Sequence, residues 1–321
     1  MKNVIDAIFN NHKGILAADE STPTIEKRLQ SVGIKSTSEN RHSYRHTIFS
    51  APNLEKYIGG VILYDETIKN ADTIAPLKDK GIVLGIKVDK GVKSYSNSGK
   101  LTEGLDGLTK RLQEYKKLGA QFAKWRAVIS LADTNACIRT NAWALARYAK
   151  ACQEEDIVPI VEPEVLMNGK HSIYEAAKIT EDVLHTVFDS LYYEDVNLEH
   201  IILKPNMVLH GYDSGTANNP DETAQITLNS FRKTVPVAVG AIAFLSGGQK
   251  DPDAITNLAN INKEFYLPWI LSFSFGRTMQ NGALQRWSNS EIDLAQKWIY
   301  NRAATCSSAV EFGINSPETD L

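Results

Sequence analysis

Eight short apolar segments alternate with longer stretches of helical character along this chain, and this alternation constrains the fold more than any other feature. The segments are rich in Ile, Val, Leu and Ala, as is typical of strands buried on both faces of a parallel sheet. The chain between successive segments is long enough for a crossover helix. The eight predicted strands span residues 14–19, 59–64, 81–89, 121–128, 157–165, 200–208, 235–246 and 267–275.

The intervening stretches carry the signals of helix ends. Thr22 followed by Pro23 predicts an N-cap and a first helical residue. Lys117 and Gly119 predict a basic last turn closed by glycine. Apolar residues at helical spacing predict further helices, and a polar stretch predicts a loop. The helices span 135–155, 173–191, 221–233 and 291–304, and the loop spans 94–100.

Eight consecutive strand–helix units without a low-complexity linker predict a single (β/α)8 TIM barrel over residues 1–312, followed by a loose tail over 313–321. A doubly wound open sheet is the alternative. That fold typically has five or six strands and a glycine-rich first turn, whereas the first predicted strand here ends in AADEST. The barrel is therefore the preferred prediction.

Composition and charge exclude several classes of protein. The 321 residues include 35 basic and 38 acidic side chains, a net charge of -3, whereas a general nucleic-acid binder needs a basic face. The three cysteines lie far apart without C-x-x-C spacing, which favours a reducing compartment. Asp6 interrupts the first apolar run, and no run is long enough to span a membrane. We expect a cytoplasmic protein that binds neither nucleic acid nor membrane.

Ionisable side chains recur inside the predicted strands, where side chains two residues apart share a face. Such charges are costly to bury unless they are paired. A salt bridge at the rim explains any one of them, but the same feature on five strands favours an active site at the strands' C-terminal ends. The residues are Asp19, Lys87 with Asp89, Lys124 with Arg126, Glu162 with Glu164, and Lys204.

The last two predicted strands carry a second signal. One ends at Ser246, Gly247 and Gly248, and the other at Ser274, Gly276 and Arg277. Loops after these two strands of a barrel commonly bind phosphate through backbone N–H groups and a helix N-terminus, and an arginine adds a charge-assisted contact. Tight turns are the alternative explanation of the glycines. Their position together with the arginine favours a phosphate site.

Lysines and carboxylates inside a barrel suggest imine chemistry. A lysine attacks a ketone only as the free amine, a form that desolvation and a neighbouring cation both favour. Lys204 lies in a buried strand, with Lys124 expected across the lumen and Glu162 as a proton shuttle. His42 and His46 have the spacing of metal ligands on a helix, but without a third ligand they are better explained as surface residues.

At these residues the chain resembles class I, Schiff-base-forming fructose-1,6-bisphosphate aldolases. The resemblance runs from near the N-terminus to about residue 287 and implies the same barrel. The matching stretches are GILAADEST (14–22), GIKVDKG (85–91), GLDGL (104–108), FAKWR (122–126), ARYAKACQEEDIVPIVEPEVL (146–166), LKPNMV (203–208), FLSGGQ (244–249) and FSFGR (273–277).

The resemblance implies roles for the catalytic residues. Lys204 resembles the imine-forming lysine, and Glu162, with Glu164 beside it, resembles the acid and base of the imine steps. Asp19 resembles the base that acts on the C4 hydroxyl during cleavage. Lys124 resembles one of a charged pair that holds substrate and tunes the nucleophile. The implied reaction is the reversible cleavage of fructose 1,6-bisphosphate to dihydroxyacetone phosphate and glyceraldehyde 3-phosphate in glycolysis and gluconeogenesis, without metal or organic cofactor.

The resemblance also implies substrate contacts and an assembly. Arg126 resembles the second member of the charged pair, beside Lys124, and Lys87 resembles a further residue that contacts the substrate. The C1 phosphate is expected at Ser246, Gly247, Gly248, Ser274, Gly276 and Arg277. The other end of the sugar bisphosphate is expected at Ser21, Thr24 and Arg28. The family further implies a homotetramer.

Two departures from the animal members are visible. The tail is short and lacks their terminal tyrosine, so the tyrosine-assisted proton exchange is not carried over. Tyr300 is the last tyrosine and is expected in a packed helix, and the segment 68–80 is shorter. Two alternatives remain: a zinc-dependent aldolase, which a chelator would inactivate, and a catalytically inactive scaffold, which a cleavage assay would identify.

Overall fold

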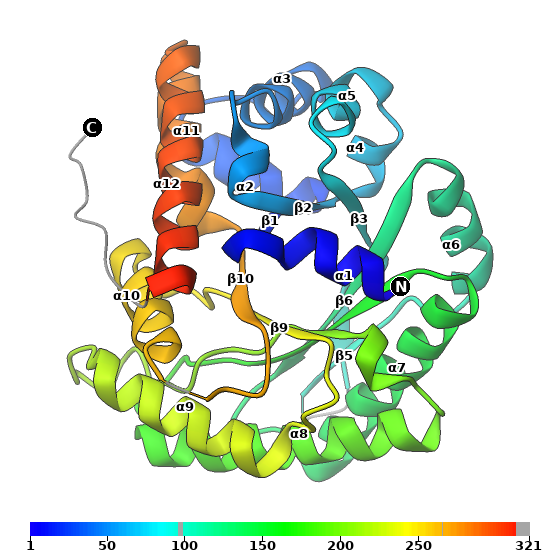
Figure 1. Cartoon of the computed structure of the whole chain (residues 1–321), viewed down its shortest axis with the longest axis vertical. Helices are drawn as coiled ribbons and strands as arrows, with labels where there is room; N and C mark the ends of the chain where they lie inside the picture. Colours follow the sequence, from blue (N-terminus) through cyan, green and yellow to red (C-terminus); the bar gives the residue numbers. More distant parts are fainter. Residues whose placement is uncertain (96–98, 265, 313–321) are drawn as a thin grey trace.

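Eight parallel strands close into a barrel in the computed structural model, which describes residues 1–95, 99–264 and 266–312 (Figure 1). Their order around the barrel is β1, β10, β9, β8, β7, β6, β3, β2. The predicted (β/α)8 barrel is confirmed, and the open sheet is wrong. The strands are β1 (Gly14–Ala18), β2 (Ile58–Leu63), β3 (Val83–Lys87), β6 (Ala120–Ile129), β7 (Val158–Val165), β8 (Ile202–Leu203), β9 (Ala241–Phe244) and β10 (Leu271–Phe275).

Helices surround the barrel, and each of the long helices predicted from the sequence is present. The α-helices outside the strands are α2 (Thr22–Ser31), α3 (Ser38–Phe49), α4 (Asp65–Ile68), α5 (Ala71–Asp79), α6 (Leu108–Lys117), α7 (Asn135–Glu154), α8 (Ile173–Tyr193), α9 (Pro220–Thr234), α10 (Asp251–Asn262), α11 (Arg277–Ser288) and α12 (Ile292–Phe312). Three 3-10 turns are η1 (Asn10–His12), η2 (Leu54–Lys56) and η3 (Leu198–His200). None of the helices within these described ranges is both long and apolar enough to cross a membrane.

Two helix ends differ from the prediction. The N-cap of α2 is Ser21 rather than Thr22, because Ser21 has the extended backbone and its carbonyl accepts the first hydrogen bonds of the helix. Helix α12 continues past residue 304, since Cys306 and Ala309 extend its buried face. Tyr300 lies in this helix, and its ring packs edge-on against Tyr57. The predicted tail, residues 313–321, lies outside the described residues.

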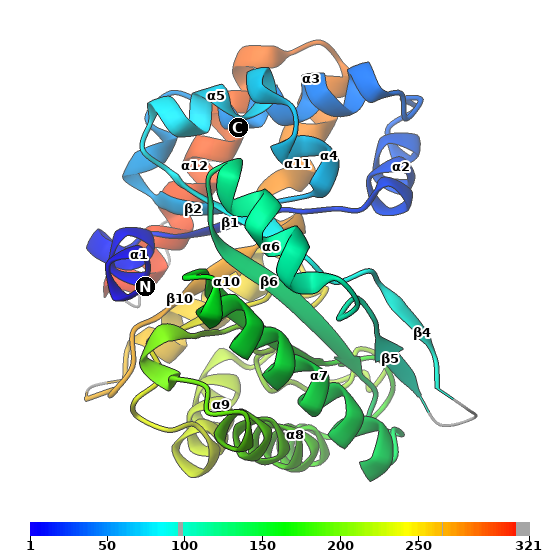
Figure 2. The ribbon, with the colours of Figure 1, turned by 90° about the vertical axis from the view of Figure 1, so that its right-hand side faces the viewer.

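A short hairpin was not predicted. Strands β4 (Val92–Ser94) and β5 (Lys100–Thr102) pair in antiparallel fashion and project from the barrel beside α7 (Figure 2). The prediction of a loop over 94–100 was therefore wrong at its two ends, and residues 96–98 lie outside the described residues. The hairpin has three exposed residues in β4, so the sequence has no apolar run there that would indicate a strand.

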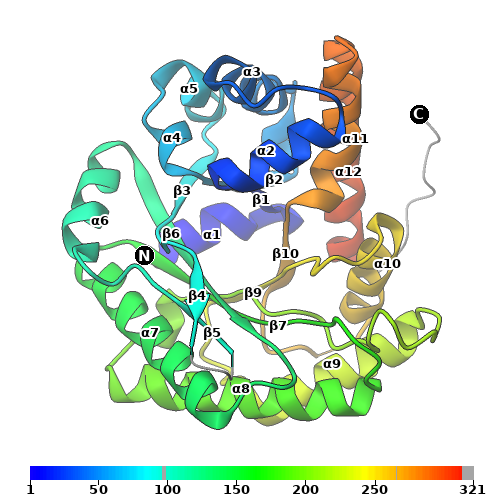
Figure 3. The ribbon, with the colours of Figure 1, turned by 180° about the vertical axis from the view of Figure 1, so that it is seen from behind.

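One end of the barrel is closed by α1 (Lys2–Phe9). Ile5, Ile8 and Phe9 pack against side chains inside the barrel, including Phe122. The helix lies against the beginning of β2, where a side chain on Gly59 would collide with the backbone of Ile8. Figure 3 views the molecule from the opposite side, with α1 behind the strands. The interior is therefore accessible from the end at which the strands finish.

Candidate active site

A pocket of about 530 Å³ lies at the C-terminal ends of the strands. It collects side chains from residues far apart in the sequence, as expected for a barrel enzyme. Every catalytic or substrate-binding residue predicted for the site lines this pocket except Gly248, and Asp89 of the predicted charged set does not line it either. The lining residues are Ala17, Asp19, Glu20, Ser21, Thr24, Lys27, Arg28, Lys87, Lys124, Arg126, Glu162, Glu164, Lys204, Leu245, Ser246, Gly247, Ser274, Gly276 and Arg277.

Lys124 is the centre of the charged cluster. Its Nζ atom lies 2.8 Å from Asp19 Oδ2, 3.4 Å from Glu162 Oε2 and 3.9 Å from Asp89 Oδ2. Burial disfavours the ammonium, but the three carboxylates outweigh it and raise the pKa of Lys124 above its usual value. Lys124 is thus a fixed positive charge.

Asp19 is held as a carboxylate. Burial raises its pKa, but the positive charges of Lys124, Lys204 and Lys87 outweigh burial and lower the pKa of Asp19 to about 2. Asp19 directly follows β1, so the strand points this group into the pocket. A carboxylate that keeps its charge at neutral pH is able to accept a proton from a substrate.

Lys204 is the second buried lysine. Its Nζ atom lies 3.1 Å from Glu162 Oε1, and both side chains are almost fully buried. The residue follows the two-residue strand β8, and its amide still donates to the Val161 carbonyl of β7 at 2.8 Å. Pro205 has no N–H and ends this pairing. Lys204 is therefore held inside the barrel next to a carboxylate that bridges it to Lys124.

Two further ion pairs line the wall. Arg126 on β6 forms an ion pair with Glu164 on β7. Burial lowers the pKa of Arg126, but the negative charges of Glu164 and Glu162 outweigh burial and raise it. Lys87 Nζ lies 2.5 Å from Asp89 Oδ1. Asp89 is buried and also accepts from the Gly91 amide at 3.1 Å. These pairs fix the side chains that face the pocket.

The predicted phosphate site offers hydrogen-bond donors without partners. The Ser274 hydroxyl is buried and makes no hydrogen bond among the described residues. Gly276 is the N-cap of α11, whose first amides have no helical acceptors. Gly247 and Gly248 have left-handed φ values of 61° and 91°, which form a turn of consecutive N–H groups of the kind that binds anions.

The wall of the same pocket that follows β1 contains Ser21, Thr24 and Arg28, as predicted. The Ser21 and Thr24 hydroxyls lie 3.1 Å apart. Arg28 forms an ion pair with Glu20, while its Nη2 atom is buried and has no partner in the described part of the chain. Burial lowers the pKa of Arg28, but Glu20 and other neighbours raise it.

Sequence reasoning missed Glu20 and Lys27, which line the pocket, and gave Asp89 no role. Glu20 directly follows Asp19, and Lys27 directly precedes Arg28. Their position next to predicted site residues is the sequence signal that could have identified them. Lys27 and Arg28 point toward one pocket because α2 begins at its rim. Asp89 contacts Lys87 and Gly91 near it in the chain, and Lys124 and the Arg126 amide on β6. The contacts with β6 join residues far apart in the sequence, so spacing does not indicate them.

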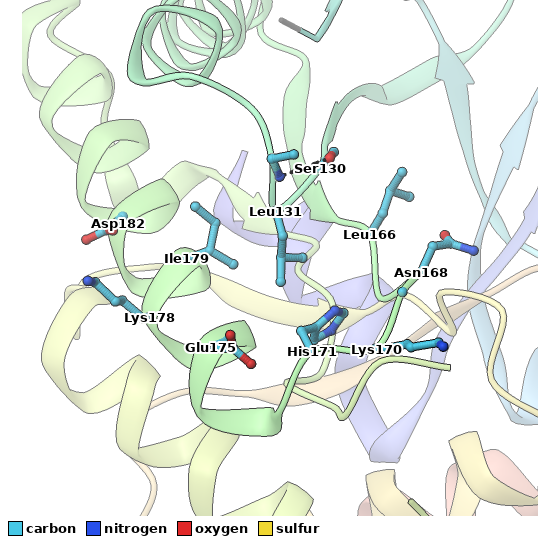
Figure 4. Close-up of a pocket in the computed structure, with 12 residues that line it drawn as sticks. Ser130, Leu131, Leu166, Asn168, Lys170, His171, Glu175, Lys178, Ile179 and Asp182 are labelled. Atoms are coloured by element: carbon cyan, nitrogen blue, oxygen red, sulfur yellow. Dashed lines mark hydrogen bonds between the residues drawn. The ribbon is translucent and has the colours of Figure 1, made fainter. Parts of the chain in front are cut away.

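Two other features lie apart from this cluster. His42 contacts Thr73 at 3.2 Å and Asn70 at 3.4 Å, whereas His46 contacts Ser50. The two histidines therefore have different hydrogen-bond partners. A second pocket, of about 600 Å³, lies beside α8 and the loops after β6 and β7 (Figure 4). Its walls include Leu131, Leu166 and Ile179, and none of the predicted site residues.

Known proteins resemble this chain over nearly its whole length. A family model described as fructose-bisphosphate aldolase class-I matches residues 1–318. A probable fructose-bisphosphate aldolase class 1 of Xylella fastidiosa (strain 9a5c) is 47% identical over 310 residues, which cover 92% of this chain and 93% of that protein. The fructose-bisphosphate aldolase of Drosophila melanogaster is 44% identical over 325 residues, covering 97% and 90%.

A solved structure of fructose-bisphosphate aldolase from Plasmodium falciparum has the same fold. It gives a TM-score of 0.95 at 40% sequence identity and covers 98% of this chain and 94% of that chain.

Proposed function

Because this chain belongs to the class I fructose-bisphosphate aldolase family, we propose that Lys204 is the lysine through which it acts. The reaction is the reversible cleavage of fructose 1,6-bisphosphate to dihydroxyacetone phosphate and glyceraldehyde 3-phosphate, a carbon–carbon lyase reaction of glycolysis. The observation that carries the assignment is the buried contact of 3.1 Å between Lys204 Nζ and Glu162 Oε1. It places a proton acceptor beside an amine inside a substrate-sized pocket.

Imine formation uses these two groups. Glu162 takes a proton from Lys204, and the free amine attacks the C2 ketone of the substrate. Glu162 returns that proton to the C2 oxygen, which gives a carbinolamine. Glu162 then takes a second proton from the nitrogen and passes it to the same oxygen, which leaves as water and produces a positively charged iminium. Lys124, 3.4 Å from Glu162, keeps its own proton and holds Glu162 in place through their ion pair.

Cleavage uses the iminium as an electron sink. Asp19 takes the proton of the C4 hydroxyl, the C3–C4 bond breaks, and its electron pair moves toward C2 to form an enamine. Glyceraldehyde 3-phosphate leaves with the new aldehyde. Protonation at C3 and hydrolysis of the imine then release dihydroxyacetone phosphate. The low pKa of Asp19, about 2, means that the carboxylate is ionised at neutral pH and has no proton of its own to lose before it accepts one.

The two phosphates of the substrate bind two groups of residues that line the pocket. The C1 phosphate binds at the glycine turn 246–248, Ser274, Gly276 and Arg277. The C6 phosphate binds near Ser21, Thr24 and Arg28, with Lys27 as a further cation at the rim. Each group contains an unpartnered buried donor, Ser274 Oγ in the first and Arg28 Nη2 in the second. These donors support the assignment, because such donors are costly without an acceptor.

Borohydride reduction tests the assignment of Lys204. With substrate present, reduction should attach the three-carbon or six-carbon sugar to the peptide that contains Lys204, detected by mass spectrometry. Lys204→Met should abolish both the adduct and cleavage, while Lys250→Met, on the loop before α10, should retain both. An adduct on a different lysine would contradict the assignment.

We also propose that the chain assembles as a cytoplasmic homotetramer. The family resemblance supports the tetramer, and the free, buried state of Cys137, Cys152 and Cys306 supports a reducing compartment. Light scattering should give four times the 35.6 kDa mass of the chain; a monomeric mass would refute the assembly.

A further inference from the structure

Tyr212 lies against the proposed phosphate site, and the reaction described above does not use it. Its hydroxyl donates a hydrogen bond of 2.9 Å to the Gly247 carbonyl. A side chain on Gly248 would lie 3.7 Å from Tyr212 Cε2 and 3.3 Å from Arg277 Nη2. The tyrosine ring and the arginine head group therefore both lie over the same glycine turn.

The hydrogen bond to Gly247 sets the direction of the next amide. In a trans peptide the carbonyl and the following N–H point in opposite directions, so a Gly247 carbonyl held by Tyr212 turns the Gly248 N–H away from the ring. Within the described part of the chain, neither the Gly247 nor the Gly248 amide donates a hydrogen bond. Both donors are thus left for a ligand.

The backbone around Tyr212 is itself fixed by the loop after β7, part of which is drawn in Figure 4. The Tyr212 amide donates to the Met167 carbonyl at 2.9 Å, and the Asp213 amide donates to the Gly169 carbonyl at 2.8 Å. In return, the Gly169 amide donates to Asp213 Oδ2 at 3.2 Å. This reciprocal arrangement limits the movement of the tyrosine relative to β7, which carries Glu162 and Glu164.

The tyrosine also remains a hydrogen-bond donor under working conditions. Tyr212 is partly exposed, and the removal of water from the rest of the side chain raises its pKa to about 12, with Glu164 adding to the increase and Arg277 opposing it. A phenol that keeps its proton donates to a carbonyl oxygen throughout the neutral range.

We propose that Tyr212 is a positioning residue for phosphate recognition, holding the Gly247–Gly248 peptide so that the Gly248 amide faces the C1 phosphate of the substrate. This inference rests on the phosphate site assigned under the proposed function. It gives Tyr212 a role in substrate affinity rather than in the chemical steps at Lys204. The tyrosine therefore affects the affinity of the site for any ligand that carries a phosphate there, including inorganic phosphate.

Tyr212→Phe tests the hydroxyl alone, because the ring is retained. We expect the inhibition constant of inorganic phosphate and the KM for fructose 1,6-bisphosphate to rise by about threefold to tenfold, the range of one hydrogen bond between uncharged groups. The kcat and the yield of borohydride-trapped imine at saturating substrate should stay within about twofold of the wild type. Tyr212→Ala should weaken phosphate inhibition further, because the ring no longer packs on the turn.

Two controls separate the possible outcomes. Tyr193→Phe removes a hydroxyl from an exposed tyrosine on α8 and should change neither constant. Arg277→Ala tests the phosphate site itself. If Arg277→Ala leaves phosphate inhibition unchanged, the assigned phosphate site is wrong. If Arg277→Ala weakens inhibition but Tyr212→Phe does not, or if Tyr212→Phe lowers kcat and imine yield instead, the role of Tyr212 is refuted and the phosphate site stands.

Discussion

Lys124 and Lys204 carry the same functional group, but their neighbours differ. Lys124 faces Asp19, Glu162 and Asp89, whereas among the described residues Lys204 forms an ion pair with Glu162. Three carboxylates keep Lys124 charged, so it provides a permanent field in the pocket. In the proposed mechanism, Lys204 transfers its proton to its one carboxylate partner, Glu162. The number of carboxylates around each lysine supports this proposed division between a charged lysine and a nucleophilic lysine.

The low pKa of Asp19 predicts a pH-dependent contribution to stability. The unfolded carboxyl has a pKa near 3.8 and the folded one near 2, so the unfolded chain takes up the proton first as the pH falls. Asp19 therefore contributes about 2 kcal/mol above pH 4 that is lost as the pH falls toward 2. The difference in free energy of unfolding between wild type and Asp19→Asn should narrow by about 1 kcal/mol between pH 6 and pH 3.

Urea denaturation at several pH values measures this difference. Asp106→Asn, at an exposed position, is the control and should show a small difference that does not vary with pH. A constant difference for Asp19→Asn over the same range would mean that the lysines do not stabilise its ionised form in the folded protein.

The charged residues themselves could be predicted from the sequence because each lies within or just after an apolar strand. Their partners could be predicted less well. The link between Lys124 and Asp19 joins β6 to the end of β1, and no spacing in the sequence encodes a contact between strands so far apart. Tyr212 was missed for the same reason, because its contacts with Gly247 and Met167 depend on how three loops meet.

At the level of the element, the conformation of the glycine turn after β9 leads us to predict an effect on substrate affinity. An alanine at Gly247 requires a left-handed backbone with φ near 61°, and its Cβ would lie 3.1 Å from Leu245 Cδ1. Gly247→Ala should lower the free energy of unfolding by about 1 kcal/mol. It should also raise the KM for fructose 1,6-bisphosphate about tenfold, because a shifted turn loses a charge-assisted hydrogen bond to the phosphate.

Gly81→Ala is the matched control for this prediction. Gly81 has a similar φ of 68°, has no atom within 4 Å of an added Cβ, and lies between α5 and β3 at the closed end of the barrel. It should show the same loss of stability in urea denaturation with an unchanged KM. Equal effects of the two variants on KM would show that the turn after β9 has no special role in binding.

The elements themselves differed in how well the sequence predicted them. All eight barrel strands were predicted because burial on both faces requires continuous apolar residues. Strand β8 is shorter than predicted, since Pro205 ends its pairing and leaves Lys204 just beyond it. The hairpin β4–β5 was missed because its stability comes from contacts with α7 and β6, including the bond from the Thr102 hydroxyl to the Arg126 carbonyl.

At the scale of the whole molecule, α1 contributes to the stability of the fold but lies away from the candidate active site. Its buried face packs at the end of the barrel opposite the lysines. Ile8→Ala should therefore lower the free energy of unfolding by about 2–5 kcal/mol, as other core truncations do, without changing kcat/KM. Urea denaturation and a cleavage assay on the same preparation measure both effects.

Asn3→Ala, on the exposed face of the same helix, is the control and should change neither quantity. A loss of kcat/KM in Ile8→Ala under conditions where the protein is fully folded would mean that the two ends of the barrel are coupled.

The position of α1 also has a consequence for the chain while it is being synthesised on the ribosome. Residues 2–9 leave the ribosome long before Ile202 and Ala241, yet they share one apolar cluster with both. During synthesis the apolar face of α1 therefore has no complete binding surface until most of the strands have followed it. A nascent chain that stalls before β9 exposes this face, and such exposed apolar surface is what chaperones bind and what drives aggregation.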